Sequence, residues 1–250
     1  MSVERFEVPF GEDRVLRGDH WQPQDARAGA LILHGGGTST AKGLAPLRDV
    51  LFAQGIASTS FDFIGHGLSD GRLIGSSLAE RSAAVDAVIA ARRLHARALA
   101  VIGFSMGGHV AALAAQRHGF AALGLVIAAA YSAGAAALKF GPEFATAIRK
   151  PLSWQDFDAF AAVAAYRGHL QIISAGADAV VPAEIQQRYF EAGRQCASRH
   201  HEIVVGSPHS LDQHFAQVPQ YRTRVYDLLA ALAIGAIIPT CSPTPSQTAP

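Results

Sequence analysis

The sequence predicts an α/β fold in which helices cover both faces of a mostly parallel sheet. Short apolar runs of strand length alternate along the chain with longer amphipathic stretches of helical length. This order of strand, helix and strand is typical of parallel sheets that are buried on both faces. Half of the 250 residues are hydrophobic and 16% are charged, which is enough apolar material for one large domain.

The individual elements follow from local patterns. Residues 5–10 alternate as a strand does, Gly11 opens a turn, and residues 15–21 can return as the second strand of a hairpin. The further strands are expected at residues 30–33, 56–61, 99–104, 123–128, 170–174 and 203–205. The helices are expected at residues 45–54, 77–94, 106–118, 183–192 and 221–238.

The residues at the ends of the predicted helices fit those positions. Gly55 and Gly119 directly follow two of them, where glycine adopts the left-handed conformation that ends a helix at little cost. Ser77 and Glu80 have the spacing of a capping box at a helix start. Pro182 precedes another helix, and proline is favoured in a first turn.

We expect one domain over residues 1–238. Residues 129–169 are longer than one connecting helix requires and contain Pro142 and Pro151, which break helices. A lid of short helices is therefore expected there. Residues 239–250 are rich in Pro, Ser and Thr, a composition that cannot bury a core, and are expected to form a disordered tail.

Charge and hydropathy narrow the functional class. The net charge is +1 and no basic block is present, which argues against a nucleic-acid partner. The N-terminus has no secretory signal, and no apolar run reaches the roughly 20 residues of a membrane span. Cys196 and Cys241 are interpreted as unpaired thiols. These features predict a cytoplasmic protein without a membrane span and leave the oligomeric state open.

A candidate nucleophile lies in the run Gly103-Phe104-Ser105-Met106-Gly107, which has the pattern G-x-S-x-G. A predicted strand leads directly into it and a predicted helix follows, which is the arrangement of a nucleophile elbow. The sharp turn would strain the backbone at Ser105, while Gly103 and Gly107 would let neighbouring backbones approach closely. We predict Ser105 as the nucleophile; the alternative is a plain glycine-rich turn.

A second glycine-rich loop, His34-Gly35-Gly36-Gly37, follows an apolar strand. A tetrahedral intermediate needs two backbone N–H donors for its oxygen. We expect Met106, at the start of the helix after the nucleophile, to supply one donor, and Gly36 to supply the other, with Gly37 as its competitor. A phosphate-binding loop is the alternative, but Lys42 is outside the frame that a Walker loop requires.

The acid and the base are predicted from the order of the elements. Active sites in such sheets lie at the carboxyl ends of the strands. Asp178 follows a late strand and is predicted as the acid. His209 follows the last predicted strand and is predicted as the base, with His214 as the alternative. His200 and His201 are expected before that strand, at the wrong edge of the sheet.

In the predicted mechanism, His209 removes the proton of Ser105 and gives it to the leaving group, while Asp178 orients the imidazole. This chemistry requires no dissociable cofactor. No metal site is expected either. His200 and His201 would point to opposite faces of a strand, and the chain has no zinc-site spacing of Cys, His and carboxylates.

Together these motifs resemble the α/β-hydrolase family over roughly residues 20–236. The resemblance rests on the loop at residues 34–37, the Ser105 motif, Asp62-Phe63-Ile64-Gly65-His66-Gly67-Leu68-Ser69, Gly176-Ala177-Asp178 and Pro208-His209-Ser210. It implies a mostly parallel eight-stranded α/β-hydrolase sheet with helices on both faces and a short helical lid. It also implies that Asp62 and His66 shape the loop after the fourth strand, the alternative being an active-site role for His66.

The resemblance implies a serine hydrolase that acts on carboxylic esters through an acyl-enzyme. The short lid and the small side chains after Leu123 favour short or medium acyl chains, so the expected partner is a small ester-like molecule. Thioesters, amides or peptides, and C–C bonds use the same machinery and stay open.

Two other functional classes also stay open: a binding protein without turnover, and a structural partner that uses the apolar C-terminal helix. Four cations of the predicted lid region are interpreted as solvated, with steering of an anionic substrate as the alternative. They are Lys139, Arg149, Lys150 and Arg167.

Overall fold

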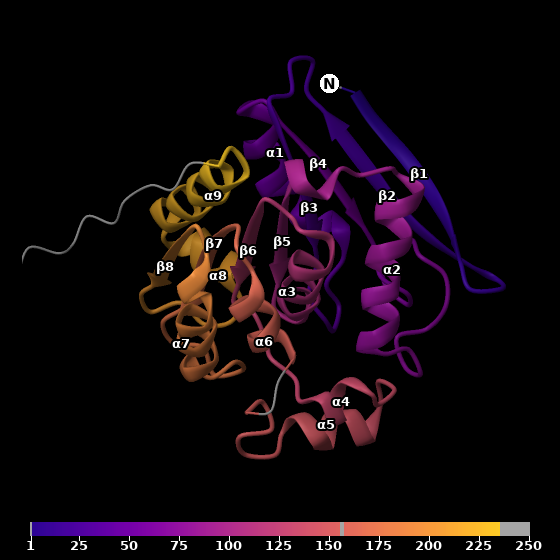
Figure 1. Ribbon diagram of the computed structural model, residues 1–250, viewed down its shortest axis with the longest axis vertical. Coiled ribbons are helices and arrows are strands. Elements are labelled where there is room, and N and C mark those ends of the chain that lie inside the picture. The colour runs from indigo at the N-terminus through magenta and orange to yellow at the C-terminus, as the bar shows by residue number, and fades with distance from the viewer. Residues whose placement is uncertain (1, 156–157, 236–250) are drawn as a thin grey trace, which may run out of the picture.

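The computed structural model describes residues 2–155 and 158–235. Within them the strands form one eight-stranded sheet in the order β1-β2-β4-β3-β5-β6-β7-β8 (Figure 1). Strand β2 is antiparallel to both of its neighbours, and the strand pairs from β4 to β8 are parallel. The predicted α/β fold with a mostly parallel sheet is confirmed.

Each predicted strand is present, with its ends shifted by a few residues. The strands are β1 (Ser2–Phe10), β2 (Arg14–Gln22), β3 (Ala28–Leu33), β4 (Ile56–Phe61), β5 (Ala100–Phe104), β6 (Ala122–Val126), β7 (His169–Ala175) and β8 (Ser198–Val204). The turn predicted at Gly11 joins β1 to β2, and Gly11 has a positive φ of +70°.

The last strand begins earlier than predicted. Strand β8 starts at Ser198, so His200 and His201 lie within it and not before it. The strand pairs along its whole length with β7 at the edge of the sheet. An edge strand is only partly buried and tolerates polar residues. For this reason the sequence shows an apolar run only at the end of β8, where the strand was predicted at residues 203–205.

Helices cover both faces of the sheet, as predicted (Figure 1). They are α1 (Ala45–Ala53), α2 (Leu78–Ala91), α3 (Met106–His118), α4 (Ala133–Ala136), α5 (Pro142–Ile148), α6 (Asp158–Ala165), α7 (Ala183–Ala192), α8 (Leu211–Gln217) and α9 (Pro219–Ala233). Alternate residues of the central strands face opposite sides. Leu31 and Val101 join the apolar cluster under α2, α3, α6 and α7. Ile32 and Ile102 join the cluster under α1, α8 and α9.

The helix ends largely match the predicted signals. Ser77 Oγ accepts a hydrogen bond from the Glu80 N–H at 3.2 Å, which is one half of the predicted capping box. The other half is absent from the described contacts, because the Glu80 carboxylate binds Arg14 at 3.1 Å. Gly119 ends α3 in the left-handed conformation, with φ +66° and ψ +42°.

The segment predicted as a lid contains two kinds of helix. Helix α6 packs against α3 and belongs to the layer over the sheet, which corrects its assignment to the lid. Helices α4 and α5 lie apart from that layer, at one end of the molecule (Figure 1). For α4 and α5 the lid interpretation stays a prediction.

Several sequence expectations fall outside the described residues: the tail at 239–250, Cys241 and the end of the helix predicted at 221–238. Among the helices that the structure describes, none is both long enough and apolar enough to cross a bilayer.

The end of α3 gives a stability prediction. A Cβ atom at Gly119 would meet no atom closer than 3.9 Å, so a side chain there changes only the backbone energy. We expect Gly119→Ala to lower the free energy of unfolding by about 1 kcal/mol, and Gly119→Asn by less, because Asn tolerates the left-handed conformation. Urea denaturation measures both; equal losses would contradict this account of the cap.

Candidate active site

Ser105 lies in the turn between β5 and α3. Its φ of +50° and ψ of −117° are values that a residue with a side chain rarely adopts. A Cβ atom at Gly103 would lie 2.3 Å from the carbonyl oxygen of Gly107, and one at Gly107 would lie 2.5 Å from that of His34. Both the strain and the close backbone approach predicted for this turn are therefore present.

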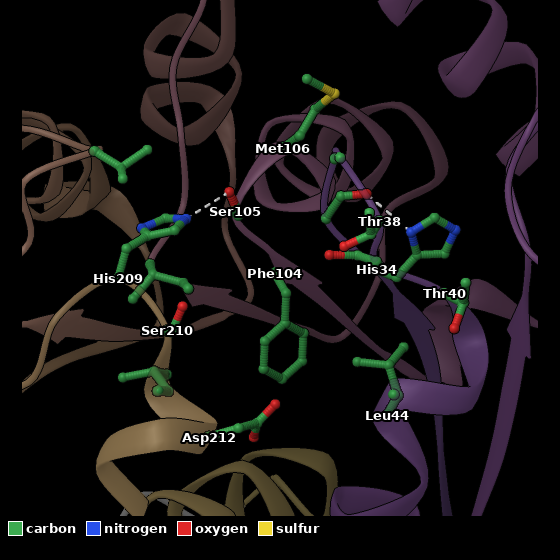
Figure 2. Close-up of a pocket in the computed structure, with 18 of the residues that line it drawn as sticks. His34, Thr38, Thr40, Leu44, Phe104, Ser105, Met106, His209, Ser210 and Asp212 are labelled. Atoms are coloured by element: carbon green, nitrogen blue, oxygen red, sulfur yellow. Dashed lines mark hydrogen bonds between the residues drawn. The ribbon is translucent and has the colours of Figure 1, made fainter.

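Ser105, His209 and Asp178 meet at the carboxyl edge of the sheet. Ser105 Oγ lies 3.0 Å from His209 Nε2, and His209 Nδ1 lies 2.8 Å from Asp178 Oδ2. Figure 2 shows the imidazole of His209 directed at Ser105. His214, the alternative base, lies in α8, where its ring centroid is 5.4 Å from that of Tyr221.

The Asp178 carboxylate is held on both oxygens. Oδ1 accepts hydrogen bonds from the N–H groups of Val180 at 2.8 Å and Val181 at 2.9 Å. Burial acts to raise the pKa of Asp178, but the hydrogen bonds from His209, Val181 and Val180 outweigh it and leave this pKa below its ordinary value. An ionised carboxylate can only accept, so the proton of a neutral His209 lies on Nδ1 and leaves Nε2 to accept from Ser105.

The glycine-rich loop lies against this serine. A Cβ atom at Gly35 would be 3.3 Å from Ser105 Cβ, and one at Gly36 would be 3.1 Å from Met106 Cε. Met106 is the first residue of α3, so its N–H has no acceptor within the helix. The two predicted N–H donors, Gly36 and Met106, thus come from segments in contact beside the nucleophile. Gly37, the competitor, is exposed.

A buried polar network lies behind the loop. Arg81 of α2 is 3% exposed, and its Nη1 donates to the Gly35 oxygen at 3.0 Å. Its Nη2 donates to His66 Nε2 at 2.6 Å, and His66 Nδ1 donates to the oxygen of Ser39 at 2.9 Å. His34 Nδ1 is a second donor to the Gly35 oxygen, at 2.8 Å.

The charges of this network follow from burial. Burial lowers the pKa of His34 and of His66, and the nearby positive charge of Arg81 lowers each of them further. Both histidines are therefore neutral at neutral pH. Burial also lowers the pKa of Arg81, to about 10, which leaves the guanidinium charged.

Asp62 shapes the neighbouring loops. Its Oδ1 accepts from the Ala41 N–H at 2.7 Å and its Oδ2 from the Leu68 N–H at 2.9 Å. Gly67 passes so close that a Cβ atom there would lie 2.0 Å from Asp62 Oδ2. These contacts, and those of His66 with Ser39 and Arg81, are those of residues that hold loops in place.

A chamber of about 540 Å³ opens beside Ser105, between the glycine-rich loop and the helices α1, α8 and α9. Its walls are mainly apolar: Leu44, Leu47, Phe104, Ile127, Leu211, Phe215, Val225 and Tyr226. Figure 2 shows Phe104 next to the nucleophile and Asp212 farther from it, below the Phe104 ring. A smaller depression of about 360 Å³ lies on the side of α5 and includes Arg149 and Lys150, both exposed.

Sequence reasoning missed two residues near this site, Arg81 and Asp212. Arg81 occupies the buried face of α2 together with Leu78 and Val85. A charged residue within an apolar helical stripe was a usable signal. Asp212 had no such signal, because an acidic residue in the first turn of a helix is common.

Comparison with known proteins identifies the family. The sequence profile of the family described as serine aminopeptidase (S33) matches residues 24–155, which include the loop at 34–37 and Ser105. This chain belongs to that family of α/β-hydrolases. A comparison with curated proteins finds no match.

Solved structures share the fold with this α/β-hydrolase. Est1E of Butyrivibrio proteoclasticus, with ferulic acid bound, matches with a TM-score of 0.66 and 20% identity, over 88% of this chain and 98% of its own. The esterase Pf2001 of Pyrococcus furiosus gives 0.66 and 20%, over 93% of each chain. The esterase EaEST of Exiguobacterium antarcticum gives 0.67 and 15%, over 90% and 98%. The family and the fold together make this protein an α/β-hydrolase enzyme, as predicted.

The strain at Ser105 predicts an unusual order of stabilities. Glycine adopts this φ and ψ freely, whereas a strained residue with a Cβ costs about 1–3 kcal/mol. We expect Ser105→Gly to have a larger free energy of unfolding than Ser105→Ala, by about 0.5–2 kcal/mol after the entropy of the unfolded glycine is included. Urea denaturation of the two variants measures the difference. An Ala variant at least as stable as the Gly variant would contradict strain at this residue.

Proposed function

We propose that this α/β-hydrolase cleaves small to medium carboxylic esters through an acyl-enzyme on Ser105. The observation that supports this most is the hydrogen-bonded chain from Ser105 Oγ through His209 to the ionised Asp178. Such a chain makes an otherwise weak hydroxyl nucleophilic, because the imidazole accepts its proton as the carbonyl is attacked.

In the proposed mechanism, Ser105 Oγ attacks the ester carbonyl while His209 Nε2 takes its proton. His209 then returns that proton to the leaving alcohol, and the acyl group stays on Ser105. A water molecule then attacks the carbonyl of the acyl-enzyme while His209 takes its proton. His209 returns this proton to Ser105 Oγ as the bond to the acyl group breaks, and the carboxylic acid is released. Asp178 holds the imidazole and stabilises its charged form throughout.

The negative charge on the carbonyl oxygen needs donors that are already in place. We propose the backbone N–H groups of Gly36 and Met106 for this role. Two observations support the assignment. A Cβ atom at Gly36 would lie only 3.1 Å from Met106 Cε, so the two residues are close, and the first-turn N–H of α3 has no acceptor within the helix. The positive end of the α3 dipole adds to the stabilisation.

The shape of the site supports the proposed substrate size. A chamber of about 540 Å³ with apolar walls suits a small or medium acyl or alcohol group. Two of the structures that share the fold are described as esterases, and a third holds ferulic acid. Cytoplasmic location stays a prediction from the sequence.

Peptide or amide cleavage is a second candidate, favoured by the description of the family as serine aminopeptidases. The same three residues would form the acyl-enzyme, and His209 would protonate an amine in place of an alcohol. Hydrolysis of alanine p-nitroanilide, measured beside p-nitrophenyl acetate, distinguishes the two activities.

Ester turnover tests the main proposal. We expect the wild type to hydrolyse p-nitrophenyl esters, with the largest kcat/KM at short or medium acyl chains because of the chamber size. Ser105→Ala should lower kcat at least ~1000-fold, the scale for loss of a nucleophile of this kind. Labelling of the wild type by a fluorophosphonate, with mass spectrometry of the modified peptide, locates the nucleophile independently.

The outcomes separate the candidate classes. Labelling at Ser105 without ester turnover would reject the esterase and leave thioesters, amides or C–C bonds. If the wild type shows no ester turnover and no labelling, catalysis at this serine is rejected and a binding protein is favoured. Equal turnover by wild type and Ser105→Ala would place any activity elsewhere.

A further inference from the structure

A buried arginine stands directly behind the loop of the proposed oxyanion hole. Arg81 is 3% exposed, and within residues 2–155 and 158–235 it pairs with no carboxylate. Its guanidinium lies over the rings of Phe63 and Phe140, 4.6 and 5.5 Å from their centroids. A buried charge without a counter-ion costs folding free energy. Packing alone does not explain why the chain keeps a cation here.

We propose that Arg81 is a positioning residue, which aims and polarises the Gly36 N–H of the oxyanion hole. This inference rests on the proposed function, because it assumes that Gly36 is an oxyanion donor. The oxygen of Gly35 and the N–H of Gly36 belong to one peptide group. In a trans peptide these two bonds point in opposite directions.

The orientation follows from the two donors on the Gly35 oxygen. Arg81 and His34 turn this carbonyl toward the protein interior, at 3.0 and 2.8 Å. The Gly36 N–H therefore points away from Arg81, and the accessible side of this loop borders the chamber with Ser105. The neutral His66 accepts from the second Arg81 nitrogen and so fixes the guanidinium plane.

The charge of Arg81 adds polarisation to this orientation. A charge-assisted hydrogen bond to a carbonyl draws electron density out of the amide and makes its N–H a stronger donor. That effect matters most when the substrate oxygen becomes negative, so it stabilises the transition state more than the bound substrate. A loss of this kind appears in kcat and leaves KM almost unchanged.

Three variants of Arg81 separate its charge from its hydrogen bond. Lysine keeps the charge, glutamine keeps a donor without the charge, and methionine keeps neither. We expect kcat on p-nitrophenyl acetate to be highest in the lysine variant, lower in the glutamine variant and lowest in the methionine variant. Arg81→Met should lower kcat by about 30–100-fold relative to the wild type, and KM should stay within about threefold of the wild-type value. The rate of fluorophosphonate labelling of Ser105 should fall in parallel, because that reaction uses the same hole.

Arg48 of α1 is a matched control. It is 2% exposed and bound to Asp19 and to Ser58, and it lies over Trp21 at 4.3 Å. It is not among the residues that line the chamber, and it makes no hydrogen bond to the glycine-rich loop within the part of the chain that the structure describes. Arg48→Met removes an equally buried arginine and should lower the free energy of unfolding, with kcat within about twofold of the wild type.

Each outcome bears on the inference. Folded Arg81 variants with kcat and labelling rates within about threefold of the wild type would overturn it, as would a loss confined to KM. If Arg81→Met does not fold, the lysine and glutamine variants decide. If the wild type is labelled but hydrolyses no ester, the proposed function fails while the labelling rates still test Arg81.

An independent observation concerns the charge of the chamber. Among the described residues that line it, Asp212 is the sole carboxylate, and no Lys or Arg is present. Figure 2 shows its carboxylate directed toward Phe104. Asp212 forms no ion pair within the part of the chain that the structure describes. Asp212 is itself exposed, so its carboxylate is open to solvent and to a ligand, and its partial burial raises its pKa.

We propose that the chamber selects substrates that carry an ammonium group on the part that extends from the ester toward Asp212. This, too, rests on the proposed function. The apolar walls favour the methyl or methylene groups around such a cation, and the aromatic residue Tyr226 is part of the same wall. Asp212 also interacts favourably with the N-terminus of α8, so the test must separate binding from folding.

Isosteric esters provide that separation, because both members of a pair are measured on the same protein. One pair is p-nitrophenyl 4-(trimethylammonio)butanoate and p-nitrophenyl 5,5-dimethylhexanoate, with the charge in the acyl group. The other is 2-(trimethylammonio)ethyl acetate and 3,3-dimethylbutyl acetate, with the charge in the alcohol. We expect kcat/KM at least ~3-fold higher for the cation in one pair, a ratio that falls with added salt.

Asp212→Asn should bring this ratio close to one. Glu184→Gln is the matched control, because Glu184 lies in the first turn of α7 and outside the chamber, and it should keep the ratio. An equal rate for both members of each pair, or the same preference in Asp212→Asn, would overturn the inference. If the wild type turns over no ester, the proposed function fails. The cation preference is then tested by the protection that choline gives Ser105 against fluorophosphonate labelling, compared with the protection that 3,3-dimethylbutanol gives.

Discussion

The sharp turn at Ser105 is the constraint on which the rest of the site depends. The turn brings the backbone at Gly103 within contact of Gly107, and Gly107 within contact of the loop after β3, so no Cβ atom fits at either glycine. Strand, helix and loop are thereby fixed relative to one another around one residue. The cost is a serine with φ +50° and ψ −117°. Strain of this kind persists only where the surrounding structure determines it, and here the two central strands β3 and β5 do so.

The parallel sheet turns this local geometry into a site. The segments after β3, β5, β7 and β8 leave the sheet at the same edge, so residues separated by about a hundred positions come within hydrogen-bonding distance. The order of the strands brings these residues together, which no local feature of the sequence could do. A shift of β8 against β7 by one residue would turn every side chain of β8 to the other face and displace the loop that carries His209. The full-length pairing of β7 and β8 prevents such a shift.

Much of this arrangement could be predicted from the sequence. Buried parallel strands are largely apolar, and β3, β5 and β6 were recognisable for this reason. Strand β4 has buried Ser and Thr residues between its apolar ends, and the polar edge strand β8 showed only its apolar end. The G-x-S-x-G run predicts its own context, because a strand and a helix must adjoin it. Ser105, Asp178, His209, Gly36 and Met106 were chosen by that logic, and their catalytic roles stay proposals. The network behind the loop could not be predicted in this way. The partners of Arg81 are His66 and Gly35, which are distant in the sequence and meet Arg81 only because α2 packs against their loops.

The two buried arginines show what this network adds. Arg48 has a carboxylate partner in Asp19 and bonds to Ser58, so its charge is balanced where it lies. Arg81 has a carbonyl oxygen, a neutral imidazole and two aromatic rings, which balance it only in part. A cation held in this way leaves a positive potential at the Gly35 carbonyl. An active site that develops negative charge next to that peptide is a place where such a potential lowers a barrier, and the incomplete balance of Arg81 is then a source of transition-state stabilisation.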